Sequence, residues 1–225
     1  MSLYTIADLH LSFGVKKPMD IFDGWNGHIE RLTENWTSVV KPEDTVVIGG
    51  DISWGMNLQQ AKPDFAYLDS LPGQKILLKG NHDYYFTTKR KIDLFFEECG
   101  FSTLRFLFNN SYDYNNVSIC GTRGWINEPG EPAEQKILLR EAGRLEFSIQ
   151  SARQTPIVFL HYPPLYIDNR SEELLKILEK HQIHHVFYGH LHGKACKYAV
   201  QGTINEITYR LVSADSLQFR PLLVL

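Results

Sequence analysis

The sequence has few cysteines, and their positions do not suit covalent or metal cross-links. Only three occur among 225 residues, at Cys99, Cys120 and Cys196, and no two of them form a Cys-x-x-Cys pair. An odd number of widely spaced cysteines predicts neither a disulfide framework nor a thiolate zinc site. With 43% hydrophobic residues, the chain has enough apolar material for one substantial core without such cross-links.

Long hydrophobic runs and a large excess of one charge are also missing. No apolar run approaches the ~20 residues that a helix needs to cross a bilayer. Residues 1–4 show no basic region followed by an apolar stretch, so we expect a cytoplasmic protein without a signal peptide or membrane contact. The 23 basic and 26 acidic residues give a net charge of −3, which argues against binding long nucleic acid through bulk charge.

What the chain does contain is a series of short apolar runs, each followed by polar residues. The runs are rich in Val, Ile and Leu, as buried parallel strands are. They cover residues 3–7, 45–48, 75–78, 157–160 and 186–188.

Apolar residues spaced by three and four indicate helices between these strands. The pattern is clearest over residues 29–39 and 138–152, where it marks one helical face. Ser171 is expected to cap another helix, and Thr87 or Thr88 a further one. Strands that alternate with helices predict an α/β fold whose parallel strands are joined by right-handed crossovers.

The tail from Lys194 to Leu225 differs because its apolar residues show no helical period. It is expected to form antiparallel strands that complete a second sheet, together with the segment from Arg105 to Gly121. No repeat and no long linker interrupts the sequence, so we expect residues 1–225 to form one domain.

Residues that can bind metal ions follow all five predicted strands. The clusters are Asp8-Leu9-His10, Gly50-Asp51, Gly80-Asn81-His82-Asp83, His161 and Gly189-His190-Leu191-His192. Ligands of open parallel sheets bind beyond the carboxyl ends of the strands, so the clusters are expected to meet at one edge. Each cluster alone could be a turn or a cap, but that interpretation would have to hold at five places together.

The candidate ligands combine carboxylate, amide oxygen and imidazole groups, without a thiolate. They are Asp8, His10, Asp51, Asn81, His161, His190 and His192. Such a set suits Mn²⁺, Fe or Zn²⁺ better than Cu(I) or an iron–sulfur cluster. A carboxylate such as Asp51 can bridge two ions, and the set would then provide four coordination bonds to each ion.

In this order the clusters resemble the calcineurin-like metallophosphoesterase family, whose pattern is D-x-H, G-D, G-N-H-D or G-N-H-E, H and G-H-x-H. The resemblance extends from residue 8 to residue 192, and every ligand position of the pattern is present. It implies a two-sheet β-sandwich flanked by helices, with four layers in the order α/β/β/α. It also implies two metal ions, one held by Asp8, His10, Asp51 and His192, the other by Asp51, Asn81, His161 and His190.

The resemblance further implies hydrolysis of a phosphomonoester or phosphodiester by a hydroxide that bridges the two ions. The family counterpart of His82 protonates the leaving alkoxide, so His82 is the expected proton donor. Asp83 is then expected to orient His82, unless it caps a helix instead.

Residues near these motifs are candidates for substrate binding. Arg123, which lies between glycines after a predicted strand, could bind a substrate phosphate or form a surface ion pair. Trp54 and Tyr84 could line the pocket or belong to the core. The stretch from Phe13 to Trp25 is expected to arch over the site as a loop.

Two other functions were weighed against a phosphohydrolase of small phosphate esters. A nuclease of the same family would need a basic groove with stacking aromatics, and the chain offers one short basic cluster, Lys89-Arg90-Lys91. A non-catalytic scaffold would be expected to have lost metal ligands or the proton donor, and none is lost. The sequence therefore favours a metal-dependent phosphatase or phosphodiesterase that binds a small substrate, with nucleic acid as the less favoured partner.

Overall fold

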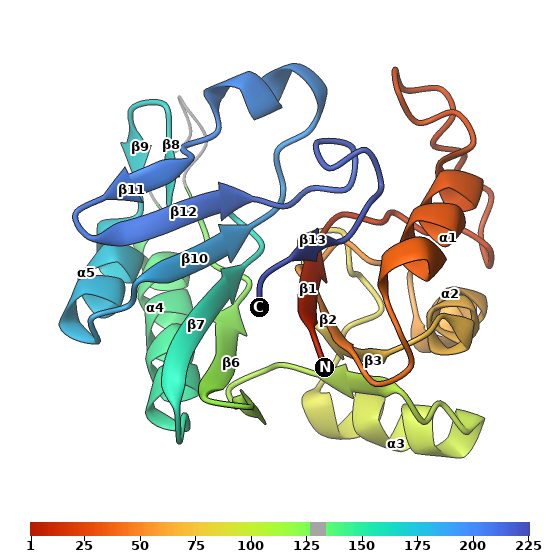
Figure 1. Cartoon of the computed structure of the whole chain (residues 1–225), viewed down its shortest axis with the longest axis horizontal. Coiled ribbons are helices and arrows are strands. Elements are labelled where there is room, and N and C mark those ends of the chain that lie inside the picture. The colour runs from red at the N-terminus through yellow and green to blue at the C-terminus, as the bar shows by residue number, and fades with distance from the viewer. Residues whose placement is uncertain (127–133) are drawn as a thin grey trace.

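The computed structural model describes residues 1–126 and 134–225. Two β-sheets lie side by side in the middle of the molecule, and helices cover the outer face of each (Figure 1). This arrangement confirms the four-layer α/β/β/α fold that the sequence predicted. Among the described residues, no helix combines the length and hydrophobicity that spanning a bilayer requires.

The first sheet has four parallel strands and one antiparallel strand at its edge. In spatial order its strands are β13 (Leu222–Leu223), β1 (Leu3–Ile6), β2 (Thr45–Ile48), β3 (Gln74–Leu77) and β4 (Leu104–Phe106). The helices on its outer face are α1 (His28–Val39), α2 (Leu58–Ser70) and α3 (Lys89–Cys99).

The second sheet is mixed, with a parallel centre and antiparallel edges. In spatial order its strands are β11 (Gly202–Ile204), β12 (Ile207–Leu211), β10 (His185–Tyr188), β7 (Thr155–Leu160), β6 (Val117–Thr122) and β5 (Tyr112–Tyr114). Its helices are α4 (Gln135–Gln150) and α5 (Glu172–Lys180). The remaining elements are a small ribbon, β8 (Leu165–Tyr166) with β9 (Asn169–Arg170), and the 3₁₀ helix η1 (Gly193–Tyr198).

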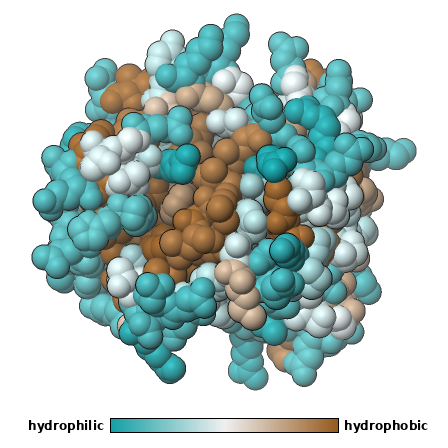
Figure 2. All heavy atoms as spheres, in the orientation of Figure 1, coloured by the Kyte–Doolittle hydropathy of each residue, from teal (hydrophilic) through white to brown (hydrophobic). Residues whose placement is uncertain are grey.

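Alternate residues of each central strand face different layers, which is why these strands carry apolar residues on both faces. In β2, Val46 and Ile48 pack toward the helices, whereas Val47 belongs to the core between the sheets. In that inner core the rings of Phe159 and Phe187 stack with centroids 5.2 Å apart. Figure 2 shows apolar side chains reaching the surface as a band along the seam between the two halves. The two sheets therefore share one hydrophobic layer and hold each other in place.

The predicted strands and all four predicted helices are confirmed, but one further helix was missed and one cap was misread. The Thr88 side chain accepts a hydrogen bond from the N–H of Lys91 and so caps α3. Ser171 occupies the N-cap position of α5, but its side chain makes no capping hydrogen bond. Helix α2 escaped prediction because Pro63 and the buried Asp64 interrupt its apolar pattern.

The prediction for the tail was right in part. Strands β11 and β12 form the expected antiparallel hairpin of the second sheet, but β12 runs parallel to β10 and β13 joins the first sheet. The chain between β10 and β12 is long enough to pass through η1 and return in the same direction, which parallel pairing requires. The prediction for Arg105–Gly121 was wrong at its start, because β4 belongs to the first sheet.

Candidate metal centre

The five polar clusters meet where β1, β2, β3, β7 and β10 end. Backbone hydrogen bonds join the loops directly, with the N–H of Asp8 donating to Gly50 O (2.8 Å) and the N–H of His10 to Asp51 O (3.0 Å). Four of the candidate ligands have positive φ: Asp8 (60°), His10 (47°), Asp51 (50°) and His190 (72°). A non-glycine residue in this conformation costs about 1–3 kcal/mol. Four such residues at one strand edge indicate that the local geometry serves a site and not stability.

Glycines next to the ligands allow the clusters to approach one another. A Cβ atom at Gly189 would overlap the carboxylate of Asp8, and a Cβ atom at Gly80 would overlap that of Asp51. The Gly that precedes His190 and the Gly that precedes Asn81 therefore make room for a carboxylate from another strand. This close packing explains the glycines of the sequence motifs physically.

Gly189→Ala is expected to weaken metal binding about tenfold or more, because the added methyl group displaces the Asp8 carboxylate. Metal titration of the apo protein by calorimetry measures this effect. The control is Gly143→Ala in α4, where a Cβ atom meets nothing within 4 Å. Equal dissociation constants for the two variants would contradict this account of Gly189.

The first group of ligand atoms surrounds Nε2 of His192. This atom lies 3.4 Å from Nε2 of His10 and 3.5 Å from Oδ1 of Asp8. Nε2 of His10 lies 3.8 Å from Oδ2 of Asp51. The candidate ligands Asp8, His10 and His192 offer atoms that all lie within 4.8 Å of one another.

The second group surrounds Oδ1 of Asn81. It lies 2.6 Å from Nε2 of His161 and 3.0 Å from Nδ1 of His190. Nε2 of His161 lies 3.6 Å from Oδ1 of Asp51. The two oxygens of Asp51 thus face different groups, Oδ2 toward His10 and Oδ1 toward His161.

Most of these separations fit atoms that share a metal ion, although the 2.6 Å between Asn81 Oδ1 and His161 Nε2 is shorter and the 3.8 Å between His10 Nε2 and Asp51 Oδ2 is longer. Ligand atoms about 2.0–2.2 Å from one ion lie about 3.0–3.6 Å from each other. The sequence motifs therefore bring together two groups of donor atoms, with Asp51 between them. All seven sequence-predicted ligands lie in this cluster.

Neighbouring groups fix which nitrogen of two imidazoles faces the cluster. Nδ1 of His161 lies 3.1 Å from Gly49 O, so it carries the proton and leaves the lone pair of Nε2 free for an ion. Nδ1 of His192 lies 3.0 Å from Oδ1 of Asp215, with the same consequence. Asp215 was missed in the sequence, since it lies in the tail, outside every motif.

Burial sets the charge of three imidazoles in the cluster. It lowers the pKa of His190 to about 3 and lowers the pKa of His10 and of His161. These rings are therefore neutral at pH 7, which is the form that binds metal ions.

The carboxylate of Asp51 and the imidazole of His192 both have a raised pKa. Burial and the adjacent Asp8 raise the pKa of Asp51 to about 8. Burial opposes the charge on His192, but Asp8 and Asp215 outweigh it and raise the pKa of His192 to about 10. A proton on His192 thus balances the negative charge of the nearby carboxylates in the metal-free protein. A metal ion at Nε2 would balance the same charge.

Comparison with known proteins identifies the family. The family model described as calcineurin-like phosphoesterase matches residues 1–194. The chain belongs to this family. The Gene 66 protein of Mycobacterium phage L5 is 40% identical to it over 80 residues, which are 34% of this chain and 37% of that protein. The match thus spans well under half of that relative's length.

Two solved structures share the fold across nearly the whole chain. The AQ665 protein of Aquifex aeolicus, described as of unknown function, matches with a TM-score of 0.54 and 19% identity, covering 99% of this chain and 95% of that one. The phosphopantetheinyl hydrolase of Mycobacterium tuberculosis matches with a TM-score of 0.58 and 12% identity, covering 100% and 95%. At these identities the similarity concerns the fold alone.

His82 lies at the edge of the metal cluster. Its Nε2 is 4.0 Å from Oδ2 of Asp51, its Nδ1 is 3.2 Å from the Tyr84 hydroxyl, and its side chain is 35% exposed. Burial, His161 and Lys17 lower the pKa of His82 to about 4. Tyr84 therefore contacts the ring of His82 and is itself half exposed.

Asp83 was expected to orient His82, but the contacts of its buried carboxylate are different. It accepts hydrogen bonds from four backbone N–H groups, those of Gly80 (2.7 Å), Asp51 (2.9 Å), Ile52 (2.8 Å) and Ser53 (3.2 Å). It does not cap a helix either, since α3 begins at Lys89 with Thr88 as its cap. Asp83 instead ties the loop after β3 to the loop after β2, and so fixes Asp51 relative to Asn81.

Asp83→Ala is expected to lower the free energy of unfolding by about 3 kcal/mol or more, because each buried N–H left unsatisfied costs about 1–3 kcal/mol. Urea unfolding of the metal-free protein measures this loss. The control is Asp93→Ala, which removes only an exposed ion pair with Lys89 and should cost less than about 1 kcal/mol. Similar losses in both variants would rule out the tying role of Asp83.

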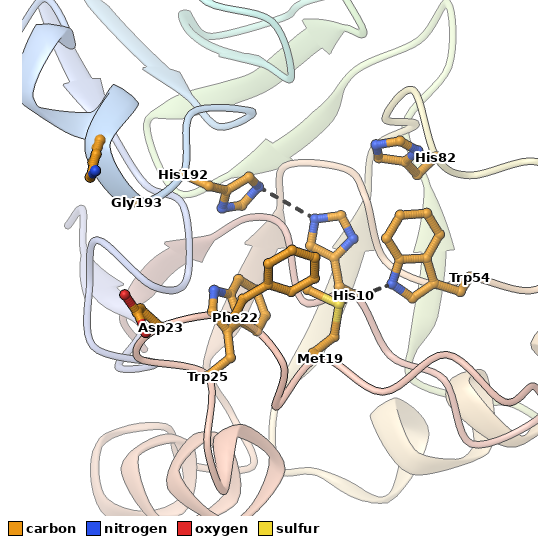
Figure 3. A pocket seen from close by; sticks show the side chains of 10 residues that line it. His10, Met19, Phe22, Asp23, Trp25, Trp54, His82, His192 and Gly193 are labelled. Atoms are coloured by element: carbon orange, nitrogen blue, oxygen red, sulfur yellow. Dashed lines mark hydrogen bonds between the residues drawn. The ribbon is translucent and has the colours of Figure 1, made fainter.

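A pocket of about 430 Å³ opens beside His10, His82 and His192 (Figure 3). We call it the aromatic pocket. Its apolar wall consists of Met19, Phe22, Trp25 and Trp54. Trp54 stacks on His10 with ring centroids 4.9 Å apart. The stretch from Phe13 to Trp25 supplies three of these four side chains, in agreement with the loop predicted over the site.

Arg123 lies away from the aromatic pocket. Its guanidinium Nη2 is 3.6 Å from Oε1 of the buried Glu141, and it lies over the ring of Trp125. Its carbonyl accepts hydrogen bonds from the N–H groups of His161 (3.1 Å) and Tyr162 (2.9 Å). The ion pair that the sequence left open as an alternative is thus formed, although with a buried partner.

Proposed function

We propose that this protein is a two-metal phosphoesterase that hydrolyses a small phosphomonoester or phosphodiester. The observation that carries the proposal is the position of Asp51, whose two oxygens face two separate groups of donor atoms. The family match supports the reaction class.

The donor set supports Mn²⁺, Fe or Zn²⁺ as the ions. One ion would be held by Asp8, His10, Asp51 and His192, the other by Asp51, Asn81, His161 and His190. Two such ions supply an activated water and neutralise the charge of the phosphate. The chain positions them through the backbone contacts of Asp8 and Asp51 and through the protons on Nδ1 of His161 and His192.

His82 is the proposed proton donor to the leaving oxygen. Its ring lines the aromatic pocket beside His10, so an ester oxygen directed into that pocket comes within its reach. Burial lowers the pKa of His82 most, nearby groups such as the cationic Lys17 lower it further, and a bound phosphate dianion opposes these effects. Phosphate binding therefore favours the protonated form that the reaction needs.

The aromatic pocket supports a small organic leaving group. Its volume of about 430 Å³ falls within the range of small-ligand pockets, about 300–1,000 Å³. Trp25, Trp54 and Phe22 offer flat apolar faces beside the proposed proton donor. A planar or apolar group on the leaving oxygen fits this wall.

The test is hydrolysis by protein stripped with a chelator and reloaded with Mn²⁺, Fe²⁺ or Zn²⁺. Substrates are p-nitrophenyl phosphate, bis-p-nitrophenyl phosphate and single-stranded DNA. We expect metal-dependent release of p-nitrophenol, with two ions per chain by metal analysis and little cleavage of DNA. Activity that survives complete metal removal, or DNA as the preferred substrate, would overturn the proposal.

A further inference from the structure

A second pocket, separate from the aromatic pocket, is lined by positive charge. It has a volume of about 240 Å³, and Lys79, Arg123, Arg140 and Arg144 lie around it. Phe86 and Phe108 form its apolar wall. We call it the basic pocket.

One carboxylate faces three of these four cations. Glu141 is fully buried, and its Oε1 lies 2.6 Å from Nη1 of Arg144, 3.6 Å from Nη2 of Arg123 and 3.7 Å from Nε of Arg140. Among the described residues, no carboxylate forms an ion pair with Lys79, whose ammonium lies over the ring of Phe86. The pocket thus keeps an excess of positive charge that Glu141 does not balance.

The excess charge is partly shielded from water. Burial lowers the pKa of Lys79, and the nearby Arg123 and Arg144 lower it further. The Nε of Arg123 is buried without a hydrogen-bond partner in the described part of the chain. Cations crowded beside two phenylalanine rings attract an anion more strongly than exposed ones, because the surroundings screen less.

The basic pocket lies on the same strand edge as the metal cluster. Lys79 follows β3 and comes two residues before Asn81, whereas Arg123 follows β6 and its carbonyl binds the N–H of His161. Strand β3 is next to β2, and β6 is next to β7. The pocket therefore lies beside the ends of β3 and β6, on the side of Asn81 and His161, whereas the aromatic pocket lies on the side of His10 and His192.

We propose that the basic pocket binds a second anionic group, a phosphate or a carboxylate, of the substrate whose ester phosphate lies at the metal cluster. Guanidinium groups bind either anion through paired hydrogen bonds, and the ammonium of Lys79 adds a point charge. The volume is about eight times the ~30 Å³ that one water occupies, which is enough for such a group with its waters. The role of the pocket in substrate binding rests on the proposed function, whereas anion binding by the pocket does not.

The first experiment compares esters that differ in one anionic group. Adenosine 3′,5′-bisphosphate is paired with adenosine 5′-monophosphate, and 3-phosphoglycerate with glycerol 3-phosphate, so that the arms distinguish phosphate from carboxylate. The ratio of kcat/KM within at least one pair should favour the ester with the extra anion. In Lys79→Gln and Arg140→Gln that ratio should fall about tenfold. Arg153→Gln, an exposed position outside the pocket, removes the same charge and should keep the wild-type ratio.

The second experiment measures binding of inorganic phosphate to chelator-treated protein by calorimetry. Phosphate should bind the wild type and bind Lys79→Gln at least about tenfold more weakly. If simple esters are hydrolysed but neither pair shows a preference, the basic pocket does not bind a second anion of the substrate. If both pocket variants keep the wild-type ratio and phosphate affinity, the basic pocket is not an anion site. If no ester is hydrolysed but phosphate binds in a Lys79-dependent way, the anion site stands and the proposed function fails.

Discussion

Asp51→Asn is expected to abolish turnover and to lower the metal content of the purified protein below two ions per chain. Within the part of the chain that the structure describes, the Asp51 carboxylate directs one oxygen toward each donor group. An asparagine offers one neutral oxygen in its place, so both ions lose a shared negative ligand. Removing the charge also removes the repulsion from Asp8, which raises the pKa of Asp51 in the metal-free protein. The apo variant should therefore fold at least as well as the wild type.

Metal analysis, calorimetric titration and hydrolysis of p-nitrophenyl phosphate measure these effects together. Asp64→Asn is a matched control, because Asp64 is also fully buried near the same loops but bonds Ser53 and Phe13 and not the donor clusters. It should retain both ions. Two bound ions and intact turnover in Asp51→Asn would reject the bridging role.

The parallel strands and the ligand set could be predicted from the sequence because both depend on local patterns. Runs such as 46–48 are apolar at every position, since one face meets helices and the other meets the second sheet. Once those strands are parallel, their polar ends must meet at one edge, and Asp8, Asp51 and His161 follow from that geometry alone.

Groups that act through long-range contacts could not be predicted in this way. Asp215 lies in a tail without a motif, and only the return of the chain beside η1 brings it to Nδ1 of His192. The four N–H groups that donate to the Asp83 carboxylate come from two different loops. The role of Asp83 therefore depends on the relative position of these loops and not on its neighbour His82. The ion pair of Arg123 with Glu141 likewise required the packing of α4 against β6.

His82→Ala is expected to reduce turnover about 10²–10⁴-fold while leaving both metal ions bound. The imidazole lies 4.0 Å from Asp51 and is one-third exposed toward the aromatic pocket, which suits a proton donor and not a ligand. An alkyl phosphate leaves as a basic alkoxide and needs the proton, whereas a p-nitrophenyl ester leaves as a stabilised phenolate. The variant should therefore lose far more activity on the alkyl ester.

The measurement is kcat for both esters at saturating metal, with metal content determined on the same samples. Tyr84→Phe is the control, since it removes the hydroxyl beside Nδ1 of His82 but keeps the ring and Nε2. It should change both rates by a similar and small factor. Equal impairment of His82→Ala on the two esters would show that the imidazole orients the site. Loss of an ion would show that it completes the site, and either result excludes proton donation as its role.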